Sequence, residues 1–230
     1  MIDLEGYGGS LMLGMVMTVK LAGCSLAIGL LLGLVGAVAK LSPSSILRAA
    51  AEGITTLIRG IPELLFVLAM FLGSSVLINK TAKFFGYGGY IDINAFWAGI
   101  IALSMIFGAY ATEVFRGAII AVPKEQALTA RAFGMTAAVT YRRIVLPQMW
   151  RFALPGLGNL FMVLLKNTAL LSVIGVQDLM RNTVSAVGYT RKPFLFYLVA
   201  TFLYLILTAI SMVCVSYLEK RAGLGFTKVR

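Results

Sequence analysis

The stretch LAGCSLAIGLLLGLVGAVA, residues 21–39, carries no charged side chain. As a helix it would cross most of a hydrocarbon layer about 30 Å thick. Four further stretches are long and apolar enough to do the same: residues 54–78, 95–112, 152–177 and 194–218. Arg59 and Glu63 interrupt the second of these five stretches, and Lys166 interrupts the fourth. The sequence therefore predicts an all-α polytopic membrane protein with five transmembrane helices.

The overall composition excludes a soluble globular domain, because the mean hydropathy is +0.92 and only 13% of the 230 residues are charged. A net charge of +11 suggests nucleic acid at first sight, but short cytoplasmic loops of membrane proteins collect Lys and Arg. We therefore expect contact with lipid and no nucleic-acid partner. The chain has no histidine, and both Cys24 and Cys214 fall in apolar spans, so we expect buried cysteines and no metal site.

The distribution of Lys and Arg predicts the orientation in the membrane. With the N-terminus outside, the cytoplasmic segments hold twelve of these residues and the external segments hold six. The predicted organisation is an external tail at residues 1–10, a membrane domain at 11–220 and a cytoplasmic tail at 221–230. In this arrangement the basic segment 123–147 lies in the cytoplasm.

The basic segment contains its own helix signals. Pro123 suits the first turn of a helix, Gly134 suits its end, and residues 137–145 predict a second helix, after which Pro147 ends the cytoplasmic segment. The segment also carries apolar side chains that a solvated loop does not need: Leu128, Phe133, Met135, Tyr141, Ile144 and Leu146. This surface either docks against a partner or packs on the chain's own helices or on lipid headgroups.

Small residues in the first span predict a close helix contact. Gly29 and Gly33 are four residues apart, and Gly36 lies near the same face. In a bilayer, glycines at this spacing allow a neighbouring helix to approach closely. We therefore expect another helix to pack against this face.

Four motifs in the chain resemble a known family. Ala130, Gly134 and the stretch IVLP at 144–147 are similar to the cytoplasmic signature of ABC importer membrane subunits, which reads Glu-Ala-Ala, three residues, Gly, nine residues, Ile-x-Leu-Pro. RGIP at 59–62, AYATEVFRG at 109–117 and RFALPG at 151–156 look like the polar amino-acid uptake permeases. The resemblance covers nearly the whole chain and is strongest to the histidine/lysine/arginine/ornithine and opine permease subunits.

The resemblance implies a permease subunit of the bacterial inner membrane, paired with an identical or homologous second permease subunit. It further implies two cytoplasmic ATPases, which bind and hydrolyse ATP with Mg, and an extracytoplasmic substrate-binding protein. No cofactor is expected on this chain, which has no Gly-rich phosphate loop ending in Gly-Lys-Ser/Thr, and the chain itself is not expected to be an enzyme.

In this family the basic segment is the region that couples ATP hydrolysis to movement of the spans. The coupling residues carried over are Leu128, Thr129, Ala130, Gly134, Ile144, Leu146 and Pro147. Leu128 and Thr129 depart from the pattern, because they stand where the family has Glu and Ala. Glu125, about one helical turn earlier, is our candidate to replace the missing carboxylate.

Charged residues inside spans point to the substrate site, because an ionised group at bilayer depth costs at least about 2.5 kcal/mol on insertion scales. Arg59 and Glu63 are four residues apart, so they can form an ion pair on one helix face. The alternative is that they belong to the substrate site, with Glu63 as the first choice of substrate ligand. Pro62 between them removes a backbone hydrogen bond and loosens the helix there. The resemblance favours Glu63 as the ligand of a cationic side chain, since this position is acidic in permeases for cationic amino acids.

The polar triplet at 166–168 is the second candidate. Lys166 is our candidate to bind the α-carboxylate of the substrate. Asn167 and Thr168 would supply neutral hydrogen bonds. The alternative is that Lys166 snorkels or pairs with Glu63 or with the carboxylate of the third span. That carboxylate, Glu113, is expected to pair structurally with Arg116 three residues later.

The function expected from all of these features is import of polar amino acids, basic ones or opines, by alternating access. The alternative is a secondary transporter or channel that uses Glu63 and Lys166 as an ion or proton relay. It lacks a visible inverted repeat, and five spans make an internal two-fold arrangement awkward. A membrane enzyme is disfavoured, because no nucleophile and base constellation is visible.

Overall fold

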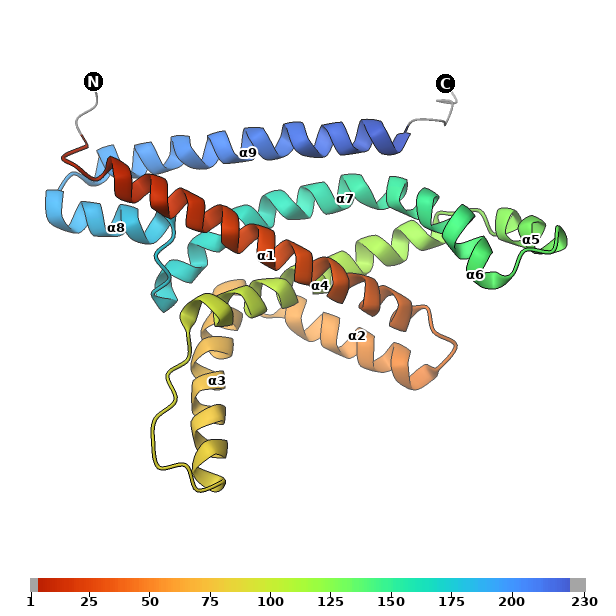
Figure 1. The fold of residues 1–230 in the computed structure, drawn as a ribbon, viewed down its shortest axis with the longest axis horizontal. Helices are drawn as coiled ribbons and strands as arrows, with labels where there is room; N and C mark the ends of the chain where they lie inside the picture. The colour runs from red at the N-terminus through yellow and green to blue at the C-terminus, as the bar shows by residue number, and fades with distance from the viewer. Residues whose placement is uncertain (1–3, 224–230) are drawn as a thin grey trace.

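The computed structural model of the chain describes residues 4–223, which form helices joined by short loops (Figure 1). In chain order the elements are α1 (Gly8–Lys40), α2 (Ser45–Gly60), α3 (Glu63–Phe84), α4 (Ala95–Ile120), α5 (Lys124–Ala132), α6 (Ala137–Thr140), the π-helical turn η1 (Tyr141–Val145), α7 (Leu146–Asn167), the 3-10 helix η2 (Thr168–Ile174), α8 (Leu179–Thr190) and α9 (Pro193–Gly223). Residues 1–3 of the predicted external tail and 224–230 of the predicted cytoplasmic tail lie outside the described residues.

Five helical runs of the described chain are long and apolar enough to cross a membrane, which confirms the predicted number: Gly8–Lys40, Glu63–Phe84, Ala95–Ile120, Ala137–Ile174 and Pro193–Gly223. The first run begins at Gly8, well before the predicted start at residue 21. The part before residue 21 contains Leu11, Gly14 and the polar Thr18, all buried, so packing within the protein rather than hydropathy alone sets its start.

The core lies where α4 crosses α1, and α4 has most of its apolar side chains buried. The predicted close contact through Gly29 and Gly33 is confirmed. A methyl group added at Gly33 would lie 2.7 Å from the Cβ atom of Ala111, and one at Gly29 would lie 2.7 Å from the ring of Phe107. Only glycine permits this approach, so these two positions set the distance between α1 and α4.

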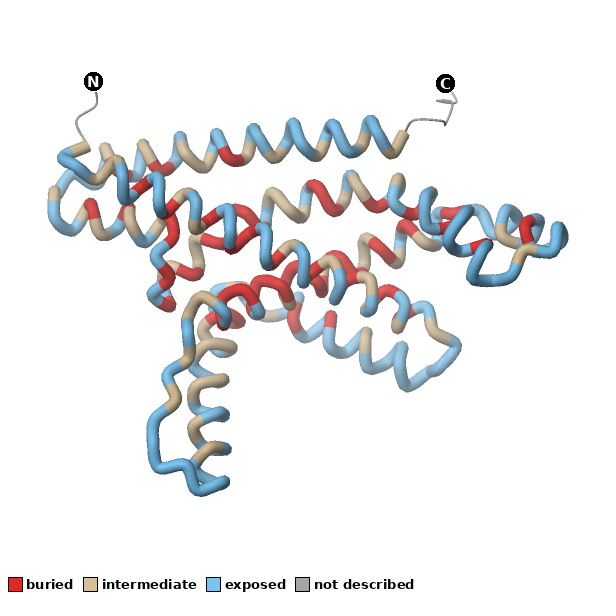
Figure 2. The backbone as a smooth tube through the Cα atoms, viewed as in Figure 1, coloured by how far each residue is buried: buried red, intermediate tan, exposed pale blue. Residues whose placement is uncertain are grey.

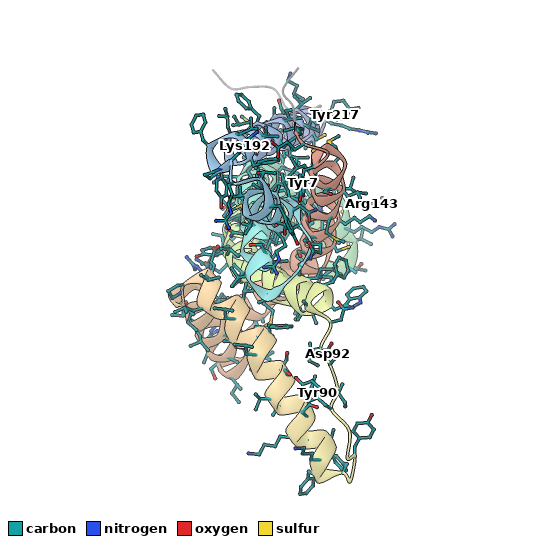
Figure 3. All side chains as sticks on the ribbon, turned by 90° about the vertical axis from the view of Figure 1, so that its left-hand side faces the viewer. Tyr7, Tyr90, Asp92, Arg143, Lys192 and Tyr217 are labelled. Carbon is teal, nitrogen blue, oxygen red and sulfur yellow. The ribbon has the colours of Figure 1, made fainter. Side chains whose placement is uncertain are left out.

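α3 stands apart from the other helices (Figures 1 and 3), with only Phe66 and Val67 buried. The loop that follows α3 folds back along it, as the labelled Tyr90 and Asp92 show in Figure 3. Two hydrogen bonds fix this loop: the Ile91 amide donates to Asn79 Oδ1 at 2.7 Å, and Asn79 Nδ2 donates to the Ile91 carbonyl at 2.9 Å. α3 and its loop therefore form one projecting arm.

The outer faces of the long helices are exposed along most of their length (Figure 2). Both cysteines lie on such faces, so the prediction of buried cysteines is wrong. The reason is that apolar residues in a membrane span also face outward, where lipid or another subunit replaces water, so hydropathy does not separate the inner face from the outer.

Candidate substrate site and coupling segment

The second predicted span is broken between Gly60 and Glu63. Ile61 is extended (φ −97°, ψ 136°), and Pro62 (φ −54°, ψ 130°) precedes the first residue of α3. A residue before proline is disfavoured in the helical region, and proline cannot donate the backbone hydrogen bond that would continue α2. The predicted single span over 54–78 is therefore wrong: α2 ends at the break and α3 leaves it in another direction (Figure 1).

The break places Glu63, which is half-buried, at a small and partly open cavity. This cavity has a volume of about 20 Å³ and is lined by Glu63, by Ile106, Phe107 and Tyr110 of α4, and by Leu160, Val163, Leu164 and Asn167 of α7. The side chains of Glu63 and Asn167 both line this space and interact there. The cavity has room for about one water molecule. A carboxylate and an amide from different helices thus meet in an otherwise apolar space.

The polar triplet at the end of α7 does not act as one group in the structure. Asn167 faces Glu63, but Lys166 lines a different cavity of about 350 Å³ beside α9, together with Tyr197 and Tyr204. Thr168 is wholly buried, and its hydroxyl donates to the Leu165 carbonyl at 2.8 Å. Successive residues of a helix project about 100° apart, which is why adjacent positions reach different neighbours.

Lys166 has none of its expected carboxylate partners. Among the described ion pairs, none joins Lys166 to Glu63 or to Glu113. Its side chain is exposed beside the polar face of α9, where Thr201 and Thr208 also line the cavity. The predicted ion pairs of Lys166 are therefore wrong.

Arg59 pairs with Glu113 of α4 rather than with Glu63. Its Nη1 atom lies 3.9 Å from Glu113 Oε1, and its guanidinium carbon lies 5.2 Å from the centre of the Tyr110 ring. The expected Arg59–Glu63 pair on one helix face is wrong, because the break at Pro62 ends the helix that would have aligned the two side chains.

A charge network surrounds Glu113. Arg116 Nε donates to Glu113 Oε2 at 2.9 Å, which confirms the predicted pair three residues apart. Lys40, the last residue of α1, reaches the other oxygen at 2.5 Å and also pairs with Glu52 of α2 at 2.8 Å. The network joins α1, α2 and α4. No sequence signal linked Lys40 to Glu113, because the two residues lie 73 positions apart.

The basic segment 123–147, which is the predicted coupling segment, begins with α5 as expected. α5 ends at Gly134, a glycine in the left-handed conformation. Gly134 has φ +81°, its amide donates to the Arg131 carbonyl at 2.9 Å, and the Met135 amide donates to the Ala130 carbonyl at 3.1 Å. These two bonds form a Schellman motif, which satisfies the last carbonyls of the helix. The predicted role of Gly134 as a helix end is thereby confirmed.

The surface of α5 offers apolar side chains outward. Leu128 is 65% exposed and Phe133 is 83% exposed, while Ala130 is buried. Thr129 and Glu125 are also exposed, and a groove of about 300 Å³ separates α5 from α6 and η1. Leu128 and Phe133 are mostly exposed rather than packed on the chain's own described helices, and docking against a partner and contact with lipid headgroups both stay predictions.

The second predicted helix of the segment continues into the fourth membrane run. Residues 137–174 form one continuous helical run, so no loop separates this helix from α7. Pro147 falls in the first turn of α7, directly after η1, where the Leu146 amide bonds to the Tyr141 carbonyl five residues back. The wider π turn accommodates a residue that lacks an N–H. Ile144 is half-buried and Leu146 is exposed beside it.

Asp178 is a buried polar residue that the sequence analysis missed. It caps α8, since its Oδ1 accepts from the Arg181 amide at 2.8 Å, and the residue is wholly buried. Its Oδ2 atom has no hydrogen-bond partner among the described residues, and neither has the buried hydroxyl of Tyr204. Burial raises the pKa of Asp178 to about 6. An Asp directly after the predicted end of a span at residue 177 is the one sequence signal that could have found it.

Replacing Asp178 with Asn is expected to stabilise the protein at neutral pH. A carboxyl group whose pKa is raised by folding destabilises the folded protein when it is ionised. The loss of folding free energy is therefore complete above about pH 6 and disappears as the pH falls below the ordinary pKa of an aspartate. Asn keeps the helix cap. In thermal unfolding in detergent, the free energy of unfolding of the variant should be higher than that of the wild type by up to about 3 kcal/mol near neutral pH. This difference should vanish toward pH 4. A difference that is independent of pH would contradict the assignment.

Comparison with known proteins gives one family. The family model described as a binding-protein-dependent transport system inner membrane component matches residues 28–223. The octopine transport system permease protein OccQ of Rhizobium radiobacter is 43% identical over 224 residues, covering 97% of this chain and 94% of the relative. The histidine/lysine/arginine/ornithine transport system permease protein HisQ of Escherichia coli is 42% identical, covering 96% of this chain and 97% of the relative.

Solved structures agree with this result. The crystal structure of an amino acid ABC transporter with histidines contains a chain that is 33% identical, with a TM-score of 0.80, and the match covers 96% of this chain and 99% of that one. A chain of the inward-facing MetNI methionine ABC transporter matches at 18% identity with a TM-score of 0.73, which shows the shared fold alone. The fold and the order of the helices are therefore those of an importer membrane domain.

Proposed function

Because this chain belongs to the family of binding-protein-dependent transport system inner membrane components, we propose that it is the permease subunit of an ATP-driven importer for basic amino acids or opines. The names of its relatives support this substrate class, since they transport octopine or histidine, lysine, arginine and ornithine. The family description and the five apolar spans agree on the inner membrane as its location.

The pairing of Glu63 with Asn167 is the observation that carries the substrate proposal. Both side chains line one cavity between α3, α4 and α7, in an otherwise apolar part of the protein. A carboxylate at this depth is costly unless it serves a cation, and it binds a guanidinium or ammonium group through charge-assisted hydrogen bonds. Asn167 adds a neutral donor and acceptor. Lys166 lies in a separate cavity and is not part of this group.

Binding of an amino acid requires the cavity to widen, because ligand pockets measure about 300 Å³ or more and this one measures about 20 Å³. α3 is a candidate for this movement, because it begins directly after the break at Pro62 and buries only Phe66 and Val67 against the rest of the chain. Movement of α3 about this break would open the cavity on one side of the membrane, which is the local event that alternating access needs.

The coupling segment supports partnership with ATPases. With the N-terminus outside, as the basic residues predict, α5 and α6 face the cytoplasm, where Leu128 and Phe133 are available for docking. A second permease subunit, identical or homologous, would cover the exposed apolar surface of α3. ATP and Mg would bind to the partner ATPases, and an extracytoplasmic binding protein would deliver the substrate.

The relay alternative needs Glu63 and Lys166 to exchange a proton or an ion. In the structure they line different cavities, one against α4 and the other against α9. No described ion pair connects them. This separation disfavours a secondary transporter that uses these two groups.

Uptake by the reconstituted importer tests the proposal. The chain is co-expressed with the ATPase, second permease subunit and binding protein encoded beside it, purified as a complex and placed in liposomes. We expect uptake of radiolabelled arginine that requires both internal ATP and the external binding protein. Uptake that proceeds without ATP would overturn the importer, and ATP-dependent uptake of neutral amino acids alone would overturn the substrate class.

A further inference from the structure

Arg59 reaches the wall of the substrate cavity from outside. It lies in the last turn of α2, one residue before the Gly60 that ends this helix. Its guanidinium carbon is 5.2 Å from the centre of the Tyr110 ring, and Tyr110 itself lines the cavity that contains Glu63. A cation within about 6 Å of an aromatic ring centre is attracted by the ring. The positive charge of Arg59 therefore lies against Tyr110, an aromatic residue that lines the cavity.

Arg59 is also the most loosely held cation of the charge network. Lys40 and Arg116 approach the Glu113 oxygens at 2.5 Å and 2.9 Å, whereas Arg59 lies 3.9 Å away, beyond hydrogen-bonding distance. The Arg59 side chain is 41% exposed, whereas that of Lys40 is 3% exposed. A small displacement would bring Arg59 from the Tyr110 ring to full contact with Glu113.

A basic substrate and Arg59 cannot both occupy this region without repulsion. A guanidinium or ammonium group bound to Glu63 would lie in the cavity that Tyr110 lines, next to the charge of Arg59. Two like charges close together repel each other, and solvent screens this repulsion only in part because Arg59 is 41% exposed. Glu113 provides a destination for the displaced side chain, and the hinge beside Gly60 allows the movement.

We propose that Arg59 is an internal competitor for basic substrates: its guanidinium rests over the Tyr110 ring in the closed cavity, and a bound cationic side chain displaces it onto Glu113. This inference rests on the proposed function, because it requires a cationic substrate at Glu63. It assigns Arg59 a specificity role. Arg59 weakens binding of cations, restricts occupancy to substrates that also engage Glu63, and couples occupancy to the network that joins α1, α2 and α4.

Equilibrium binding to the purified complex, without the binding protein, tests the proposal with two probes. Arginine carries the charge, and citrulline is its uncharged analogue of nearly the same shape. In Arg59→Met we expect arginine to bind about tenfold more tightly, the change expected from removing one competing cation–aromatic contact. Citrulline affinity should change by less than about threefold, because no charge competes with it. Arg59→Lys should return arginine affinity toward the wild-type value.

Two controls separate the possible causes. Lys83→Met removes a positive charge from the exposed far end of α3 and should leave both affinities unchanged. Arg59→Gln serves as the second test if the methionine variant does not assemble. Wild-type complex that binds arginine, with no gain in either variant, would overturn the role of Arg59 alone. Wild-type complex that binds citrulline as tightly as arginine would overturn the proposed substrate class and this inference with it.

Discussion

Gly134→Ile is expected to reduce arginine uptake by about tenfold or more while leaving the protein in the membrane. Gly134 has φ +81°, a region that a β-branched residue adopts only with strain, and no atom lies within 4 Å of a Cβ placed there. The strain of about 1–2 kcal/mol is relieved by moving the turn between α5 and α6, which would shift the surface that we propose contacts the ATPase. Uptake should fall by about tenfold or more, the factor that 1.4 kcal/mol represents.

Two variants distinguish lost coupling from general backbone strain. Gly134→Asn should retain most of the uptake, because Asn tolerates the left-handed region. Gly86→Ile introduces the same strain at φ +86°, in the loop after α3, also with no atom within 4 Å. Its uptake should stay near that of the wild type. ATP hydrolysis, uptake and membrane yield are measured for all of these variants. An equal loss of uptake in Gly134→Ile and Gly86→Ile would contradict the coupling role of Gly134.

Glu63→Gln is expected to reduce binding of arginine by about tenfold to a hundredfold, since hydrogen bonds to charged groups contribute about 1.5–3 kcal/mol. Glutamine keeps the size of the side chain and its contact with Asn167 but removes the charge. Citrulline binding should change little. The measurement is equilibrium binding of both probes to the purified complex.

Glu52→Gln is the matched control for this prediction. Glu52 pairs with Lys40 in the charge network but does not line the cavity. Its loss should affect both probes equally and weakly, since its side chain is 67% exposed. If Glu63→Gln weakened arginine and citrulline to the same extent, Glu63 would be structural and the proposed selectivity for basic substrates would be wrong.

The features that the sequence predicted correctly depend on local patterns. Five apolar runs, the glycines that face α4 and the end of α5 at Gly134 each follow from neighbouring residues whose chemistry restricts the backbone. The pair Glu113–Arg116 is of the same kind, since three residues form about one helical turn. For such features the physical cause lies within a few positions of the chain.

The features that the sequence did not predict depend on contacts between distant segments. Pro62 was expected to loosen a helix, but a complete break separates Arg59 from Glu63 and gives each a partner on another helix. Lys166 and Asn167 are adjacent in sequence, yet they face different helices because the helix rotates about 100° between them. The cavity that contains Glu63 and Asn167 exists only where α3, α4 and α7 meet, and no local pattern specifies that meeting.

Identification of the chains that co-purify with this one from its native membrane is the most direct test of its role as an importer subunit. Purification in mild detergent followed by mass spectrometry should recover a protein with a Gly-rich phosphate-binding loop. That protein should be lost when Leu128 and Phe133 are both replaced by Asp, which keeps α5 exposed but removes its apolar contact. Recovery of the chain without any such protein, in a state that still moves arginine across vesicles lacking ATP, would contradict the account.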